Sequence, residues 1–443
     1  MKTIRIGSGA GYGGDRLEPA LTLMEQGNLD YICFECLAER TIALAQKEKK
    51  ANPNKGYNHL LEYRMEKVLS LAYKHKIKVI TNMGAANPIA AMEVIANMAK
   101  QQELKGLKIA AVLGDNVLEN VKEAPHLEIL ETGQPLSSIS DSMISANAYL
   151  GVEGIVEALN NGADIIVTGR VADPSLFLAP MVFEFNWQLT DTDKLGKGTM
   201  IGHLLECSAQ VCGGYFADPP KKIVPNLANI GFPFVEVNEH GDGFISKVKG
   251  TGGLINTATC TEQLLYEIHD PSKYFTPDVV ADFSKVTFEE IDMDTVQFKD
   301  ASGHPATNTY KVSVGYVNGF FGEGQISYGG ANALARANLA MDTMKQRLAD
   351  YGFEDLRFDL IGVNSLAPFN VEVMEVPEVR LRVSGRAATA EQAKHIGREV
   401  EALYTNGPAG GGGASQKVEG VISVLSVLSP KSDIKIEVVY TNI

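Results

Sequence analysis

A chain of 443 residues exceeds what one hydrophobic core normally serves, so we expect two domains. Its composition, 45% hydrophobic and 21% charged, is typical of a folded globular protein. A formal net charge of -14, without basic residues clustered among aromatic ones, excludes binding of a nucleic-acid backbone. No apolar run approaches the ~20 residues that span a bilayer, and the start MKTIRIGSGAGYGG lacks a secretory pattern, so we expect a cytoplasmic protein without membrane attachment.

A glycine-rich stretch, GSGAGYGGDR, follows the first predicted strand. Gly9, Gly11 and Gly14 match the GxGxxG spacing of dinucleotide-binding folds, and Glu35 follows the second strand where such folds place a ribose-binding acid. A polar catalytic loop is the favoured interpretation, because Asp15 near the next helix would repel a pyrophosphate. We therefore predict no nicotinamide cofactor.

The five cysteines form an odd set in a large chain, which favours reduced thiols over a disulfide framework. Cys33 and Cys36 spell CxxC, but they lie in a predicted strand running into a loop. Buried small side chains are the favoured interpretation, and we assign them no redox role.

Short apolar runs alternate with helix-period segments in the first half of the chain. The predicted strands are 4–6, 31–34, 77–81, 109–113 and 165–168, and the predicted helices between them include 38–50, 60–74, 91–101 and 152–160. This alternation predicts an α/β domain with a mostly parallel, doubly wound, Rossmann-like sheet. Asn82, Asp115 and Arg170 each follow a strand, so we expect them at one sheet edge, although asparagine and aspartate are also routine turn formers.

Around residue 198 the pattern changes. DTDKLGKGTM is predicted as a polar connector, and the helix MIGHLLECSAQVCGG follows it. Short strands with glycine turns and two helices, 332–351 and 390–403, make up the remainder. We therefore predict an α/β domain over 1–198 and a mixed α+β domain over 199–443. The late run GPAGGGGAS is interpreted as a flap, a backbone anion nest or a flexible linker.

Arg170 is the first candidate site residue, because a guanidinium at a strand end can bind a carboxylate or phosphate through two hydrogen bonds. An ion pair with Asp173 is the equally supported alternative, and the two are compatible if Asp173 orients the arginine. Glu206 shares a helix face with His203, a usable acid–base pair, although a core histidine beside a structural glutamate is the commoner arrangement. Whether the pair binds a metal stays open.

Glu323 is flanked by glycines, which exposes its carboxylate, as a turn glutamate would also be. The predicted catalytic residues are thus Arg170, Asp173, Glu206, Asp15 and Glu323. The predicted substrate-binding residues share a position in a glycine loop, at a strand end or on the Glu206 helix face; they are Gly9, Gly11, Gly13, Gly14, Arg16, Asn82, Asp115, Asn147 and Gln210. No metal or cofactor is assigned.

Five strings in order along nearly the whole chain, GSGAGYGGDR, GRVADPSLFLAP, HLLECSAQVCGGYFADP, GTGGL and VGYVNGFFGEGQISY, resemble the acyclic terpene utilisation protein AtuA family. The resemblance implies a place beside enzymes that degrade acyclic terpenes such as citronellol and geraniol through CoA thioesters, or small organic acids. It implies a pathway class rather than a reaction. The chain departs from the family pattern at CFEC and at Cys212, where a threonine is usual, which argues against an obligatory threonine hydroxyl.

We therefore expect a metabolic enzyme acting on a branched or unsaturated carboxylic acid or its CoA thioester. Hydration, dehydration or isomerisation is the favoured reaction class, because no strong redox motif is present. The alternative is a non-catalytic or ligand-binding subunit of an acyl-CoA carboxylase or lyase complex. The expected partners are the small-molecule substrate and further copies of the chain, and the sequence leaves open a small partner subunit.

Overall fold

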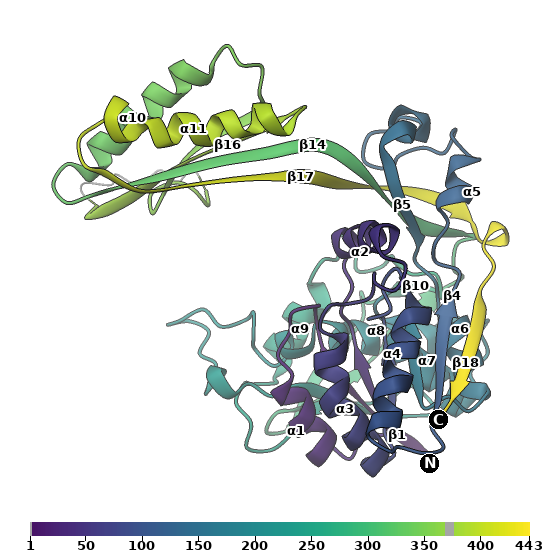
Figure 1. The fold of residues 1–443 in the computed structure, drawn as a ribbon. Helices are drawn as coiled ribbons and strands as arrows, with labels where there is room; N and C mark the ends of the chain where they lie inside the picture. Colours follow the sequence, from purple (N-terminus) through teal and green to yellow (C-terminus); the bar gives the residue numbers. More distant parts are fainter. Residues whose placement is uncertain (1, 368–375) are drawn as a thin grey trace. The chain divides into compact units, whose positions relative to one another are not determined.

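The computed structural model describes residues 2–367 and 376–443 (Figure 1). They form two compact units: unit 1 is Met1–Gly315 with Val424–Ile443, and unit 2 is Tyr316–Ser423. The chain enters unit 2 within strand β14 (Thr309–Gly329) and returns within strand β17 (Gly411–Pro430). The predicted boundary after residue 198 instead falls inside a helix of unit 1.

Unit 1 is built on a large mixed sheet. Its described strands lie in the order β11-β12-β8-β7-β1-β2-β3-β6-β4-β18. Their bounds are β1 (Thr3–Ala10), β2 (Tyr31–Phe34), β3 (Lys78–Thr81), β4 (Lys108–Leu113), β6 (Ile165–Thr168), β7 (Pro233–Asn238), β8 (Gly243–Lys247), β11 (Thr287–Asp292), β12 (Thr295–Lys299) and β18 (Glu437–Asn442). The short strands β9 (Tyr274–Phe275), β10 (Val280–Asp282) and β13 (Ser302–His304) form a separate small sheet, and β5 (Met143–Ala148) pairs with β14.

The prediction of an α/β fold is confirmed, but a mostly parallel Rossmann-like sheet is not. Strands β1, β2, β3, β6 and β4 are parallel to their neighbours, whereas β7 and β18 flank them in antiparallel pairing and the strands beyond β7 continue it. The parallel strands lie in the order β1-β2-β3-β6-β4, with the antiparallel β7 on the other side of β1, which differs from the order of a Rossmann sheet. Short apolar runs indicate strands, but they do not encode strand direction.

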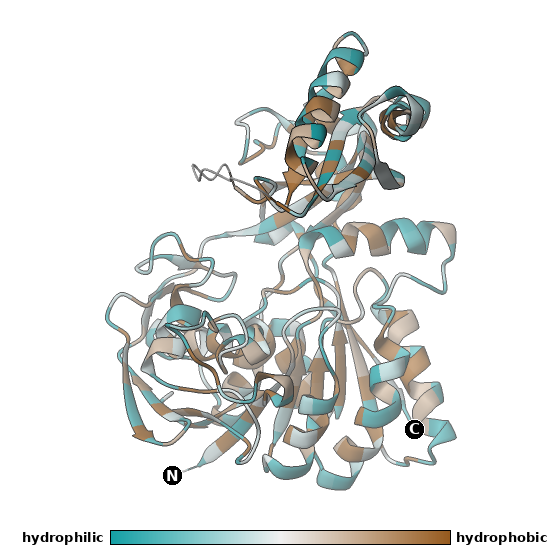
Figure 2. Ribbon diagram, turned by 90° about the vertical axis from the view of Figure 1, so that its left-hand side faces the viewer, coloured by the Kyte–Doolittle hydropathy of each residue, from teal (hydrophilic) through white to brown (hydrophobic). Residues whose placement is uncertain are grey.

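Helices cover both faces of the parallel strands. One face carries α1 (Glu18–Gln26), α3 (Leu61–His75) and α4 (Pro88–Gln101), and the other carries α6 (Glu153–Asn160), α7 (Ser175–Phe185) and α8 (Thr192–Glu206). In β2, Ile32 and Phe34 pack toward the first face while Tyr31 and Cys33 pack toward the second. Figure 2 shows the strands as hydrophobic and much of the outer helix surface as hydrophilic. The parallel strands are thus largely buried between two layers of helices, as is usual for parallel sheets.

Helix α8 replaces the polar connector predicted at DTDKLGKGTM. Its glycines are packing contacts: a Cβ on Gly196 would lie 2.0 Å from the Ser302 carbonyl oxygen, and one on Gly202 would lie 2.6 Å from that of Pro174. Glycine here permits close approach of other segments rather than breaking the helix. The helix ends at Glu206, before the predicted end at Gly213.

Unit 2 has the element order strand, helix, strand, strand, helix, strand. After β14 come α10 (Ala333–Leu348), β15 (Glu354–Ile361), β16 (Glu378–Ala387), α11 (Ala390–Asn406) and β17, and the sheet order is β15-β16-β14-β17. This is the split β-α-β arrangement of ferredoxin-like domains. Both helices pack on one face of the sheet, over Ile326, Leu381 and Val383 (Figure 1). The linker interpretation of GPAGGGGAS is wrong from Gly411 onward, because strand β17 begins there.

Unit 1 also contains α2 (Glu39–Ala51), α5 (Leu118–Lys122) and α9 (Thr257–Leu265). Across residues 2–367 and 376–443, no helix combines the length and apolar character needed to cross a membrane.

Candidate active site

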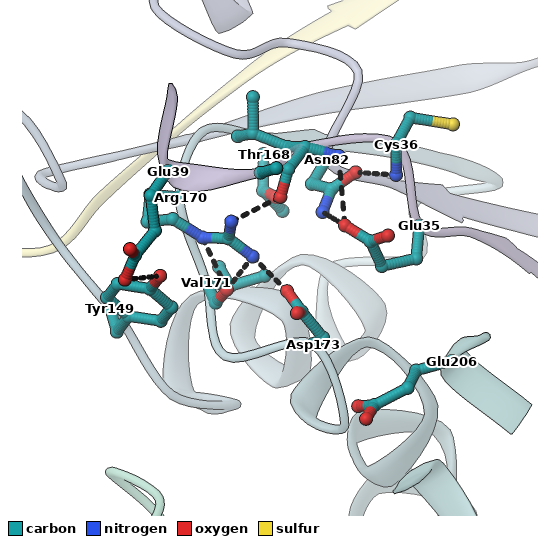
Figure 3. Close-up of polar contacts among 12 residues, drawn as sticks. Glu35, Cys36, Glu39, Asn82, Tyr149, Thr168, Arg170, Val171, Asp173 and Glu206 are labelled. Atoms are coloured by element: carbon teal, nitrogen blue, oxygen red, sulfur yellow. Dashed lines mark hydrogen bonds and ion pairs between the residues drawn. The ribbon is translucent and has the colours of Figure 1, made fainter. Parts of the chain in front are cut away.

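The parallel strands of unit 1 place polar residues together where they end. Glu35 follows β2, Asn82 follows β3, Asp115 follows β4 and Arg170 follows β6. Figure 3 shows Glu35, Asn82 and Arg170. An Asn82 amide N–H donates to Glu35 Oε1 at 2.9 Å, and the Arg170 backbone N–H donates to Asp115 Oδ2 at 2.9 Å. The sheet edge thus brings together residues from four segments, as expected for strands that share a direction.

Arg170 is bound almost entirely by the protein itself. Its side chain is 1% exposed, and its guanidinium donates to the carbonyls of Leu37 and Val171 and to the Asp173 carboxylate. The guanidinium carbon also lies 4.6 Å from the ring centroid of Tyr149. An arginine with this many internal acceptors has little capacity left for a substrate carboxylate. The contacts favour the interpretation in which Arg170 forms an ion pair with Asp173.

Asp115 and Asn147 stabilise the backbone turn that carries Arg170. Asn147 Nδ2 donates to Asp115 Oδ2 at 2.8 Å, and both side chains are buried. Burial raises the Asp115 pKa. The hydrogen bonds from the Arg170 backbone and the Asn147 side chain, and the Arg170 charge, act against the shift. Gly169 lies against the carboxylate, since an added Cβ would come within 2.5 Å of Oδ1. Asp115 and Asn147 therefore hold the turn that presents Arg170.

Glu35 is a buried carboxyl group that remains protonated at neutral pH. Removal from water and the nearby negative charge of Asp173 raise its pKa to about 8, despite opposing effects of Arg170 and the hydrogen bonds from Leu37 N–H and Asn82. A carboxylic acid with such a pKa can donate a proton at pH 7.

Asp173 stands between Glu35 and Glu206 in Figure 3, where the three side chains come from separate segments. Its side chain is 37% exposed, unlike those of Glu35 and Glu206. Desolvation raises the Asp173 pKa, Arg170 opposes the shift, and the charge of Glu267 adds to it. Asp173 is thus the carboxylate of this group that is open to solvent.

Glu206 and His203 form a buried acid–base pair on α8. His203 Nδ1 lies 2.6 Å from Glu206 Oε1, while His203 Nε2 and Glu206 Oε2 have no hydrogen-bond partner among the described residues. Burial raises the Glu206 pKa to about 7, with His203 opposing. Burial lowers the His203 pKa, but the Glu206 charge outweighs that effect, so the net shift is upward. The two groups can share a proton near neutral pH and present a free atom each.

The first part of the glycine stretch belongs to β1, and a loop begins only after Ala10. Gly9 lies inside β1, where the ring of Phe34 occupies the adjacent space, and a Cβ on Gly11 would lie 2.5 Å from the Cys207 backbone. Helix α1 begins only at Glu18, beyond a turn in which Asp15 accepts hydrogen bonds from the Gly11 and Arg16 backbone N–H groups. The amide groups therefore serve the protein's own carboxylate, and burial raises the Asp15 pKa despite those bonds.

The other predicted residues lie farther from the carboxylates or lack contacts with them. Gly13 and Gly14 border Cys36 and Tyr12, and the exposed Arg16 donates to the Ala228 carbonyl at 2.9 Å. Gln210 follows α8 in a short 3-10 turn, with its backbone N–H bonded to Cys207. Glu323 lies in unit 2 on strand β14, where it accepts a hydrogen bond from Gln325 at 2.7 Å. The interpretation of Glu323 as a turn residue is wrong, because its segment is a paired strand.

A cavity of about 770 Å³ opens beside α9. Its lining mixes apolar, hydroxyl and charged side chains, namely Phe216, Lys222, Thr257, Ala258, Thr261, Glu262, Leu265, Tyr266 and Glu267. Glu267 is one of the lining residues, and its charge contributes to the raised pKa of Asp173 and of Glu206. On its other side, α9 contacts α8, where Gln263 Nε2 donates to the His203 carbonyl at 3.0 Å. Helix α9 thus contributes residues to the cavity and also contacts α8, the helix that carries His203 and Glu206.

Sequence reasoning did not assign Glu35 or Glu267 to the site. Glu35 carried a signal, since a charged residue directly after a buried strand is unusual. Glu267 carried none, because a long segment separates it from the other acids. Across the described ranges no group of three or more histidine, cysteine, aspartate or glutamate side chains is arranged to hold a metal ion, and all five cysteines are free.

Glu35→Gln is expected to flatten the pH dependence of stability between pH 5 and pH 9. Because folding raises the Glu35 pKa from its ordinary value of 4.5 to about 8, the folded protein must lose stability as the pH rises through that window. Glutamine resembles the protonated acid and retains an oxygen for Leu37 N–H. The wild-type protein and the variant should have similar melting temperatures at pH 5. At pH 9 the variant should have the higher melting temperature. Parallel curves would contradict the raised pKa.

No curated protein and no solved structure matches this chain significantly. A family model does match, and it covers residues 4–440. The five strings that carried the resemblance lie within this span, so the predicted family is confirmed. The chain belongs to the acyclic terpene utilisation protein family AtuA.

Proposed function

We propose that this protein is an enzyme of acyclic terpene utilisation that transfers protons on a branched, unsaturated carboxylic acid or its CoA thioester. Membership of the family implies the pathway. The observation that supports the reaction class is the buried pair His203–Glu206, whose members each have an unsatisfied polar atom, beside the protonated Glu35. Hydration, dehydration and isomerisation each need one group that accepts a proton and one that donates it.

In the hydration direction, Glu206 with His203 accepts a proton from water as the water oxygen bonds to the β-carbon. The protonated carboxyl group of Glu35 supplies a proton to the α-carbon, so the double bond is consumed and one water is added. Arg170 keeps Asp173 in place through the contacts described above. Dehydration is the reverse, and isomerisation omits the water.

Deuterium incorporation tests the reaction class even while the substrate is unidentified. The protein is incubated in D₂O with branched unsaturated C10 acids and their CoA thioesters, and products are analysed by mass spectrometry. We expect exchange of a carbon-bound hydrogen or a gain of one water for at least one compound. Compounds that stabilise the protein thermally but show neither change would instead favour a non-catalytic, ligand-binding subunit.

The cavity beside α9 is proposed to hold the apolar chain of the substrate. Its apolar lining includes Phe216, Leu265 and Tyr266, which suits a hydrocarbon chain. Ala258→Trp places an indole in this space and is expected to raise KM by roughly tenfold or more with kcat less affected, because binding of the chain is lost rather than proton transfer.

Lys249→Trp is the matched control for this variant. Lys249 is exposed and does not line the cavity, so the same large side chain should leave KM unchanged there. Steady-state kinetics on the best compound of the deuterium screen measures both variants. An unchanged KM in Ala258→Trp would remove the cavity from the substrate-binding region.

A further inference from the structure

One face of the unit 2 sheet is polar. Along β16, Val379, Leu381 and Val383 face the helices, so the alternate residues Arg380 and Arg382 lie on the opposite face. Strand β14 pairs with β16 in register, Gln325 opposite Arg382 and Ser327 opposite Arg380. Basic and hydroxyl-bearing side chains thus lie side by side on this face.

The arginines of this face differ in how their charge is compensated. Arg382 is 2.6 Å from Asp359, and Arg386 is 3.7 Å from Asp355. Arg380 bonds only to neutral side chains: Nε donates to Gln325 at 2.5 Å, Nη1 to Ser327 at 2.8 Å and Nη2 to Ser415 at 2.9 Å. Within the described residues, no carboxylate forms an ion pair with Arg380.

These three contacts fix the guanidinium and leave hydrogen-bond donors free. Arginine has five N–H groups, of which three are used here. Ser327 and Ser415 accept from Arg380 through their oxygens, and neither hydroxyl donates to a described residue, so each retains its own O–H. A half-buried guanidinium and two hydroxyl donors therefore converge at one place.

The glycine run beside Arg380 keeps this place uncovered. Gly413 has a φ of +62°, and a Cβ built on it would lie 3.7 Å from Arg380 Nη1. A Cβ on Gly412 would meet nothing within 4 Å. Side chains at these positions could cover the guanidinium, whereas glycine leaves room for a ligand to approach the backbone.

We propose that Arg380, Ser327 and Ser415, with the adjoining Gly412–Gly413 backbone, bind a phosphate group. The charge and the several donor directions suit a tetrahedral oxyanion, which accepts hydrogen bonds on more than one oxygen. Glu323 lies nearby through Gln325, and its negative charge opposes the binding of any anion at this place. The proposal does not depend on the reaction assigned to unit 1.

The phosphate is either free inorganic phosphate or the phosphate ester of a nucleotide. Calorimetric titration of the full-length protein at low ionic strength with inorganic phosphate, adenosine 3′,5′-bisphosphate and acetate separates these sources. We expect saturable binding of at least one phosphate compound and markedly weaker binding of acetate. Equal binding of acetate and both phosphates, or none at all, would overturn the proposal.

Ser415→Asp supplies the missing carboxylate at the exposed position that now accepts from Arg380 Nη2. It should reduce phosphate affinity by roughly tenfold or more, because the new charge neutralises the arginine and repels the ligand. Gln416→Glu adds the same charge at the neighbouring exposed residue and should have a much smaller effect. Arg380→Gln should likewise abolish binding while Arg386→Gln preserves it. Wild-type affinity in Ser415→Asp would remove Arg380 from any phosphate site.

Discussion

Glu206→Gln is expected to lower kcat/KM by about a hundred- to ten-thousandfold, the range over which general acid–base groups contribute. Glutamine keeps the shape of the side chain and an oxygen that can accept from His203 Nδ1, so helix α8 should fold normally. It cannot accept a proton. The loss should therefore appear mainly in kcat, measured on any compound that exchanges deuterium.

The same variant has a readout that does not require a substrate. The Glu206 charge raises the His203 pKa, so its removal should lower that pKa, and NMR titration of the imidazole measures the change. Glu153→Gln is the matched control, since Glu153 Oε2 is also buried without a hydrogen-bond partner in the described structure but lies near Asp278. Full activity in Glu206→Gln beside an altered His203 titration would show a structural pair.

Arg170→Met is expected to reduce the free energy of unfolding by roughly 2–4 kcal/mol, the cost of leaving two buried carbonyl acceptors without donors beside a partly exposed carboxylate. Methionine fills much of the volume, but the Leu37 and Val171 carbonyls lose their donors and Asp173 loses its counter-charge. Arg170→Lys keeps a charge and some of the hydrogen bonds, so its loss should be smaller.

Arg16→Met is the control for this prediction. Arg16 is exposed and bonds to the Ala228 carbonyl, so its replacement should cost no more than about 1 kcal/mol. Chemical denaturation of the variants gives the comparison, together with affinity for a substrate compound. If Arg170→Met retains its stability but loses ligand affinity, then Arg170 binds substrate directly.

The sequence predicts the helices and strands of unit 1 well because their patterns are local. Helices 38–50 and 60–74 were expected and appear as α2 and α3, and the strand 165–168 is β6. Strand direction depends on partners far along the chain. Neither the antiparallel pairing of β1 with β7 nor that of β4 with β18 could be deduced from an apolar run.

Glycine caused the main local errors. In DTDKLGKGTM it suggested a connector, but Gly196 is required by contact with Ser302, more than one hundred residues later. In GxGxxG it suggested a polar catalytic loop, but Gly9 lies inside β1 and Phe34 occupies the space beside it. A glycine indicates that another group comes close to the backbone, but it does not indicate whether that group belongs to a ligand or to the protein.

The expectation about the sheet edge depended on strand direction. Asn82, Asp115 and Arg170 follow the parallel strands β3, β4 and β6, so they lie at one sheet edge. Glu267 lies in a turn after α9, and its charge contributes to the raised pKa of Glu206. No spacing rule in the sequence relates it to Glu206. The roles of these residues remain predictions for the experiments above.

Strand β18 has a consequence for the synthesis of the protein. It pairs with β4 along Lys108–Leu113, so the unit 1 sheet needs residues that leave the ribosome after all of unit 2. Unit 2 is continuous over residues 316–423 and can fold first. Until β18 has been synthesised, the edge of β4 with which it pairs remains unpaired. Such an edge is a template for association with other chains. Nascent chains stalled before residue 437 should therefore depend on chaperones for solubility more than the finished chain does.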